Sequence, residues 1–157
     1  MSCSNEDDHP VYTNGKDIEA FAANGELLYR RYKKEHYQEK RLLPAAFQFP
    51  KQSVNRQKFS NPEDVLHVDC CNGKRFEGWG VLEISSADMP TPLESPDGKL
   101  FHFIPEHEPL VCCYAHSVIR VKSGESNTFV DAPSTKVKET FRVQLALKMK
   151  VRIAATA

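Results

Sequence analysis

The most regular pattern of apolar and polar positions lies near the carboxyl-terminal end of the chain. From Phe141 to Ile153 every second residue is apolar, and most of the residues between them are basic or carry an amide. Because successive side chains of a strand point to opposite sides, strict alternation gathers the apolar residues on one face. The pattern therefore predicts a long C-terminal strand with one buried face, at the centre of a sheet or in the wall of a barrel.

A different spacing marks the N-terminal part. Between residues 16 and 39 apolar residues recur three and four positions apart, with Asn24-Gly25 as an interruption. This spacing predicts one broken helix or two short ones, ended by Pro44. Residues 43–62 then contain three prolines. They are expected to form a long connection, of the kind that often carries functional residues.

Three more stretches have strand character. Residues 76–84 place glycines on both sides of Trp79, residues 100–104 alternate, and residues 110–121 are apolar on both faces, as in a central strand. Pro96-Asp97-Gly98 is a strong turn signal between two of them. Together the patterns predict an α+β fold, with an N-terminal helical segment packed on a mainly antiparallel sheet of about five strands and a long C-terminal strand.

Length and composition narrow the organisation and the setting. A chain of 157 residues predicts one domain, with residues 1–14 as a flexible leader and 15–157 as a single α+β domain. The start of the chain lacks the apolar core of a secretory signal, and no stretch approaches the roughly 20 apolar residues of a membrane span. Five cysteines, four of them in adjacent pairs, do not resemble a secreted disulfide framework. We therefore expect a cytoplasmic protein without a membrane partner.

Two clusters of histidine and cysteine suggest a zinc site, His67-Val68-Asp69-Cys70-Cys71 and Cys112-Cys113-Tyr114-Ala115-His116. On a strand, however, residues four apart lie about 13 Å from each other. Ligands of one tetrahedral zinc lie within about 4 Å of each other. We therefore predict no metal and no cofactor, and interpret the thiols as small buried apolar groups. Two half-sites shared between paired strands, and a nucleophilic Cys70 or Cys113, are the alternatives.

A polar constellation beside the apolar strands is the best candidate for chemistry. Two histidines can exchange protons near neutral pH, a tyrosine hydroxyl can stabilise a substrate oxygen, and an arginine recognises phosphate through two hydrogen bonds. The predicted catalytic residues are His102, Tyr114 and His116, and the predicted substrate-binding residues are Asn55, Arg56 and Ser117. A metal-dependent alternative would use His107 with its neighbours Glu106 and Glu108.

Two classes of function follow from these observations. The first is an enzyme acting on a nucleotide, nucleic acid or other phosphate compound, although equal numbers of basic and acidic residues, 21 each, disfavour a grip on nucleic acid by the whole surface. The second is a non-catalytic interaction module or adaptor subunit, with a protein partner bound through a strand edge. No phosphate loop, dinucleotide fingerprint or hydrolase elbow occurs. The enzyme requires Arg56, His102 and His116 in one pocket, whereas the module requires an exposed apolar patch or an open strand edge.

Overall fold

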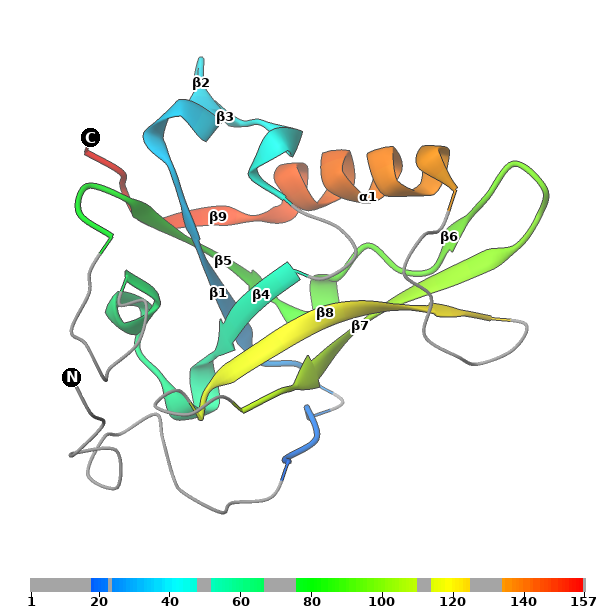
Figure 1. The fold of residues 1–157 in the computed structure, drawn as a ribbon, viewed down its shortest axis with the longest axis horizontal. Coiled ribbons are helices and arrows are strands. Elements are labelled where there is room, and N and C mark those ends of the chain that lie inside the picture. The colour runs from blue at the N-terminus through cyan, green and yellow to red at the C-terminus, as the bar shows by residue number, and fades with distance from the viewer. Residues whose placement is uncertain are drawn as a thin grey trace.

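The computed structural model of the protein describes residues 18–22, 24–47, 52–66, 76–109, 114–124 and 134–156. Its main feature is an antiparallel sheet of seven strands that curls into a half-barrel (Figure 1). The strand order across this sheet is β6-β7-β8-β4-β1-β5-β9. The strands are β1 (Leu27–Tyr32), β4 (Gln52–Arg56), β5 (Gly80–Ser85), β6 (Leu93–Glu94), β7 (Leu100–His107), β8 (His116–Ser123) and β9 (Lys150–Ile153).

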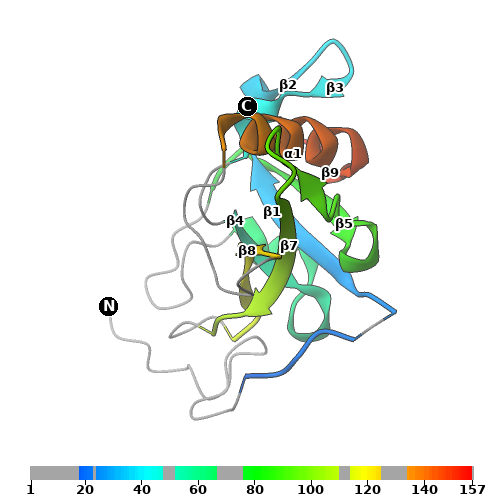
Figure 2. The same cartoon turned by 90° about the vertical axis from the view of Figure 1, so that its right-hand side faces the viewer.

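Smaller elements complete the fold. A separate hairpin of two short strands, β2 (Tyr37–Gln38) and β3 (Arg41–Leu42), projects from the body of the molecule, and the helix α1 (Thr135–Lys148) lies across one side of the sheet (Figures 1 and 2). Within the described ranges, five 3-10 turns connect the elements: η1 (Lys34–His36), η2 (Pro44–Ala46), η3 (Gln57–Phe59), η4 (Pro62–Leu66) and η5 (Ser86–Asp88).

The predicted long C-terminal strand is wrong, because α1 occupies most of that stretch and only β9 is extended. The side chain of Ser134 caps the helix by accepting a hydrogen bond from the backbone N–H of Val137. The buried residues Val137, Phe141 and Leu145 are four apart, which is the spacing of one helical face. The alternation from Phe141 onward masked this spacing, although the Lys, Glu, Arg and Gln residues between Val137 and Leu145 are good helix formers.

The predicted N-terminal helix is also wrong, since residues 27–32 form β1 in the middle of the sheet, paired with β4 and β5. Leu28 and Tyr32 belong to the main core on the side of α1. Tyr29 faces the other way and packs with Val65 and Val81 in a second, smaller cluster. Because both faces of β1 are covered, its sequence lacks the alternation of a half-exposed strand.

The predicted connection 43–62 contains the central strand β4, which pairs with β1 and β8. The expected strands near 100–104 and 110–121 correspond to β7 and β8, and these two do pair antiparallel. In the described residues the main sheet has seven strands and the one α-helix lies toward the C-terminal side, so the fold is mostly β and the α+β prediction with about five strands is corrected.

Two predictions lie outside the described residues. They are the flexible leader 1–14 and the possible metal clusters, of which 67–71 and the two cysteines at 112 and 113 are not described. In the part of the chain that is described, no helix is long and apolar enough to cross a membrane.

Candidate functional site

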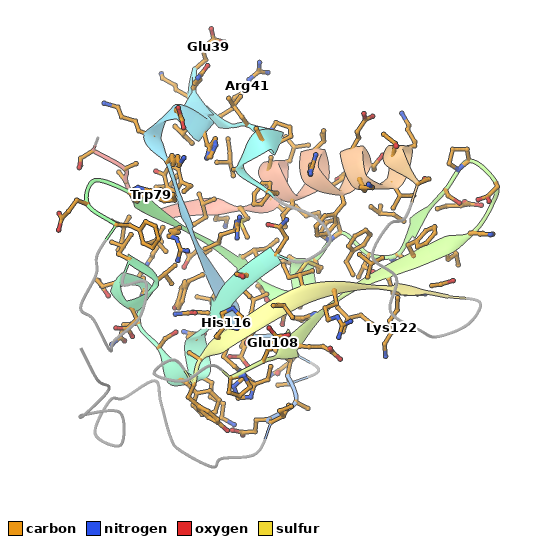
Figure 3. All side chains as sticks on the ribbon, in the orientation of Figure 1. Glu39, Arg41, Trp79, Glu108, His116 and Lys122 are labelled. Carbon is orange, nitrogen blue, oxygen red and sulfur yellow. The ribbon has the colours of Figure 1, made fainter. Side chains whose placement is uncertain are left out.

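The two predicted catalytic histidines lie toward opposite ends of the β7–β8 ribbon. His102 on β7 is paired with Lys122 near the end of β8, whereas His116 begins β8. Lys122 lies six positions after His116 along β8, which corresponds to about 20 Å at the usual rise of a strand. Figure 3 shows Lys122 and His116 well apart along this strand. The structure therefore does not bring His102 and His116 together as an acid and base pair.

His116 itself has a defined orientation. Its Nδ1 lies 2.8 Å from the carbonyl oxygen of Glu108 and 4.0 Å from the carboxylate of the same residue, and Figure 3 shows the two side chains next to each other. Because a carbonyl oxygen only accepts, Nδ1 of His116 donates this hydrogen bond. Asn55 stands directly opposite His116 on β4. A phosphate-directed reaction stays a prediction, and in this structure it would rest on His116 and Asn55.

Arg56, predicted to bind substrate, is almost completely buried, with 1% of its surface exposed. Its guanidinium donates hydrogen bonds to both carboxylate oxygens of Glu26 and to the carbonyl oxygens of Glu19 and Ala20. We call residues 18–22 the strap. Arg56 thus fastens the strap to β4. The predicted substrate residue Ser117 is fully buried too, and its Oγ donates to the carbonyl of the residue two positions before it.

His107, considered above as a metal ligand, holds the strap from the other side. Its Nδ1 accepts the backbone N–H of Glu19 at 2.9 Å, so its Nε2 carries the hydrogen and donates to the carbonyl oxygen of Tyr114 at 2.5 Å. The rings of Phe59 and Tyr114 pack against the buried imidazole, with centroids 5.5 and 4.7 Å from it. Among the described residues, no group of three His, Cys, Asp or Glu side chains is placed to hold a metal ion. In the structure His107 therefore holds the strap, and Tyr114 supports His107 through its carbonyl oxygen and its ring.

Stability should depend on pH through His107. Burial, assisted by the nearby charge of Arg56, holds the pKa of His107 below its ordinary value of 6.5, although the bond to the Tyr114 carbonyl acts in the opposite direction. The unfolded chain therefore binds a proton more readily than the folded one, and the contribution of His107 is complete above about pH 6.5 and is lost as the pH falls through the lower folded pKa.

We expect the free energy of unfolding to decrease below this pH with a slope of at most about 1.4 kcal/mol per pH unit from this one group. Chemical denaturation of the protein and of His107→Gln between pH 7.5 and pH 5 measures it, because the variant lacks the titrating ring. An identical pH slope in both proteins would contradict the assignment.

A groove that the sequence did not indicate lies between the β2–β3 hairpin and the end of α1 with β9. It has a volume of about 700 Å³. Four of the side chains that line the groove are large, apolar and exposed: Tyr37, Val143, Leu147 and Val151. Leu147 is the extreme case, with 77% of its surface exposed. Leu42, Leu82, Ala146 and Met149 also line this groove, so much of its wall is apolar.

The charged residues that line the groove are all basic. Lys40 and Arg41 belong to the hairpin, and Lys150 belongs to β9. No ion pair among the described residues involves any of these three cations. The groove is therefore an apolar surface bordered by three cations that form no ion pair with the described residues.

The hairpin wall of the groove carries backbone strain at its tip. Glu39 and Lys40 connect the strands with φ values of 52° and 63°. A two-residue hairpin turn of this kind favours Asn and Gly, because a side chain at positive φ meets the backbone. Figure 3 places Glu39 and Arg41 on the projecting hairpin. Residues in such conformations cluster at functional sites, which directs attention to this end of the molecule.

One signal in the sequence could have pointed to the groove. The run 141–153 holds more apolar residues than one helical face can bury. Once α1 is recognised, Val143 and Leu147 are left on the face that is not packed against the core.

Comparisons of the chain with models of protein families, with curated proteins and with solved structures find no match.

Proposed function

We propose that this protein is a non-catalytic interaction module that binds a segment of a partner polypeptide in the groove beside α1 and β9. The observation that carries the proposal is a concentration of exposed apolar side chains. Of the six large hydrophobic residues that are exposed in the described ranges, four line this one groove. Contiguous exposed apolar surface with a polar border is typical of binding sites, whereas isolated exposed residues are ordinary.

The position of β9 supports the same proposal. β9 is the last strand in the sheet order and pairs with β5, while in the described part of the chain no strand pairs with its outer edge. An open edge offers backbone hydrogen-bonding groups to another chain. Here the open edge adjoins the apolar groove, since Lys150 and Val151 belong to both. The two features that an interaction module requires are thus found in one place.

The alternative enzyme has weaker support. Its arginine donates to groups of the protein itself, and its two histidines are about 20 Å apart along the ribbon, by the usual rise of a strand. Phosphate recognition by Arg56 would require the strap to be released. The groove requires no rearrangement, because four of its large apolar side chains and its three cations are already exposed.

Site-specific photo-crosslinking tests the proposal. A photoreactive amino acid replaces Leu147 in the full chain, in the cells that make it, and in a matched variant it replaces Leu100, an exposed leucine on β7 away from the groove. We expect a discrete adduct from position 147 and none from position 100. Adding Val143→Asp, which puts a charge into the groove, should lower the yield about 10-fold, as expected for truncation of a central interface contact. Equal adducts from both positions, or a yield unaffected by Val143→Asp, would refute the groove as the binding site.

A further inference from the structure

We infer that the partner segment is acidic as well as apolar, with side chains that enter the groove and carboxylates that face its basic border. This inference rests on the proposed function of the groove and adds the chemistry of its partner. A neutral partner would form no ion pairs with the cations of the groove, whereas the carboxylates of an acidic partner could pair with them.

Positive charge is concentrated in the segment that forms one wall of the groove, although the whole chain has a formal net charge of zero. The stretch 134–156, which contains α1 and β9, has a single carboxylate, Glu139. Its six cations are Lys136, Lys138, Arg142, Lys148, Lys150 and Arg152. This segregation makes a local field that attracts an acidic segment, although the molecule as a whole is neutral.

The cations of the groove lining stand on both of its walls. Lys40 and Arg41 stand on the hairpin wall, and Lys150 stands on the facing wall formed by β9. Between them the surface is aliphatic, through Val143 and Leu147. A segment in the groove would therefore meet apolar groups along its centre and cations on both flanks. Such an arrangement selects alternating or amphipathic sequences of apolar and acidic residues.

The edge of β9 is poorly suited to pairing with a second copy of this chain. β9 has four residues, and its pairing with β5 is interrupted by a register shift between Val81 and Leu82. If two copies paired through this edge, Lys150 and Arg152 of one copy would also lie near the same cations of the other copy. Short length, irregular pairing and like charges all oppose self-association of an edge strand. The same cations favour an acidic partner strand or helix.

The aliphatic character of the groove also separates the possible classes of partner. Single-stranded nucleic acids bind basic grooves mainly by stacking bases on aromatic rings. Here the most exposed apolar residue is Leu147, beside Val143 and Val151, and Tyr37 is the one aromatic residue in the groove lining. Aliphatic side chains complement the apolar side chains of a polypeptide, so the observations favour an acidic polypeptide over a nucleic acid.

Fluorescence anisotropy with the full chain and synthetic peptides tests the inference. The probe is a peptide in which leucine and aspartate alternate. One control peptide has serine in place of leucine, and the other has lysine in place of aspartate. We expect the probe to bind and each control to bind at least about 10-fold more weakly, since both apolar burial and charge matching contribute. Binding of the probe should weaken as salt is added, because the charges at the border are exposed to solvent.

Variants of the protein locate the binding. Lys150→Glu should reduce affinity for the probe several-fold, whereas Lys136→Glu, which changes the net charge equally but lies in the first turn of α1 and outside the groove lining, should have little effect. Equal effects of both substitutions, or equal binding of the serine control, would refute recognition in the groove.

Binding to anionic lipid vesicles or to a single-stranded oligonucleotide, without binding to the probe, would also overturn the inference. If crosslinked adducts form at Leu147 but the probe does not bind, the acidic partner is wrong and the proposed function stands; if neither occurs, both fail.

Discussion

Replacement of Arg56 by methionine is expected to destabilise the protein by about 3–5 kcal/mol, the usual cost of breaking a buried ion pair by removing one partner. The side chain of Arg56 is 1% exposed and that of its partner Glu26 is 13% exposed. Without the guanidinium, the carboxylate of Glu26 would lose its neighbouring cation, and the carbonyl groups of Glu19 and Ala20 would lose their donors. Methionine fills a similar volume, so most of the loss reflects these polar groups and not a cavity.

Two controls make this result specific. Lys58→Met removes an ion pair with Glu19 in which both side chains are about half exposed, and such pairs contribute about 0–1 kcal/mol. The double variant Arg56→Met with Glu26→Gln should recover part of the stability, because it removes the unpaired charge as well. Urea denaturation measures all of these variants, and hydrogen exchange at residues 18–22 reports the strap directly. A loss below about 1 kcal/mol for Arg56→Met would mean that Arg56 does not hold the strap, since that is the level of an exposed pair.

Phe141→Ala is expected to destabilise the protein by about 3–5 kcal/mol, the range for removing a buried aromatic side chain. Phe141 is 1% exposed and stacks on Phe103, with ring centroids 3.9 Å apart and planes 9° from parallel. This contact joins α1 to β7 at the centre of the main core. Alanine would leave a cavity between the helix and the sheet that neither element can readily close.

Val143→Ala is the matched control, and it separates the helix from the predicted strand. On a strand, Phe141 and Val143 would share one buried face, and both substitutions would be costly. On α1 the side chain of Val143 is 45% exposed, so its truncation should change stability by no more than about 0.5 kcal/mol. Denaturation curves of both variants decide between the two. Similar large losses would contradict the helix.

The difference between helix and strand in this stretch shows where sequence patterns reach their limit. The residues from Phe141 to Ile153 satisfy period two, and the residues Val137, Phe141 and Leu145 satisfy a helical spacing at the same time. Alternation indicates a strand only when all of its apolar positions share one buried face. Val143 and Leu147 are apolar and yet exposed. The residues that made the pattern look like a strand are those that form the groove.

The candidate sites depended on register, which the sequence does not state. The sequence patterns predicted strands around His102 and around His116, and these strands, β7 and β8, pair antiparallel. Which residues stand opposite each other is decided by the pairing, and it sets His102 against Lys122 and His116 against Asn55. A shift of two residues would change every one of these neighbours without changing the alternation of faces. The sequence pattern therefore identifies polar residues on strands but does not show which of them lie side by side in the sheet.

Local patterns in the sequence predicted strands at 76–84, 100–104 and 110–121 of a mainly antiparallel sheet, and the structure has β5, β7 and β8 in these regions, because turn residues and local alternation are encoded within a few positions. The tertiary structure decided the rest. β1 is covered on both faces by neighbours distant in sequence, so its strand character has no local signature. The groove combines residues 37–44, Leu82 and residues 143–151, and the strap is held by Arg56 and His107 from two strands. Such sites exist only when the folded chain brings separate segments together.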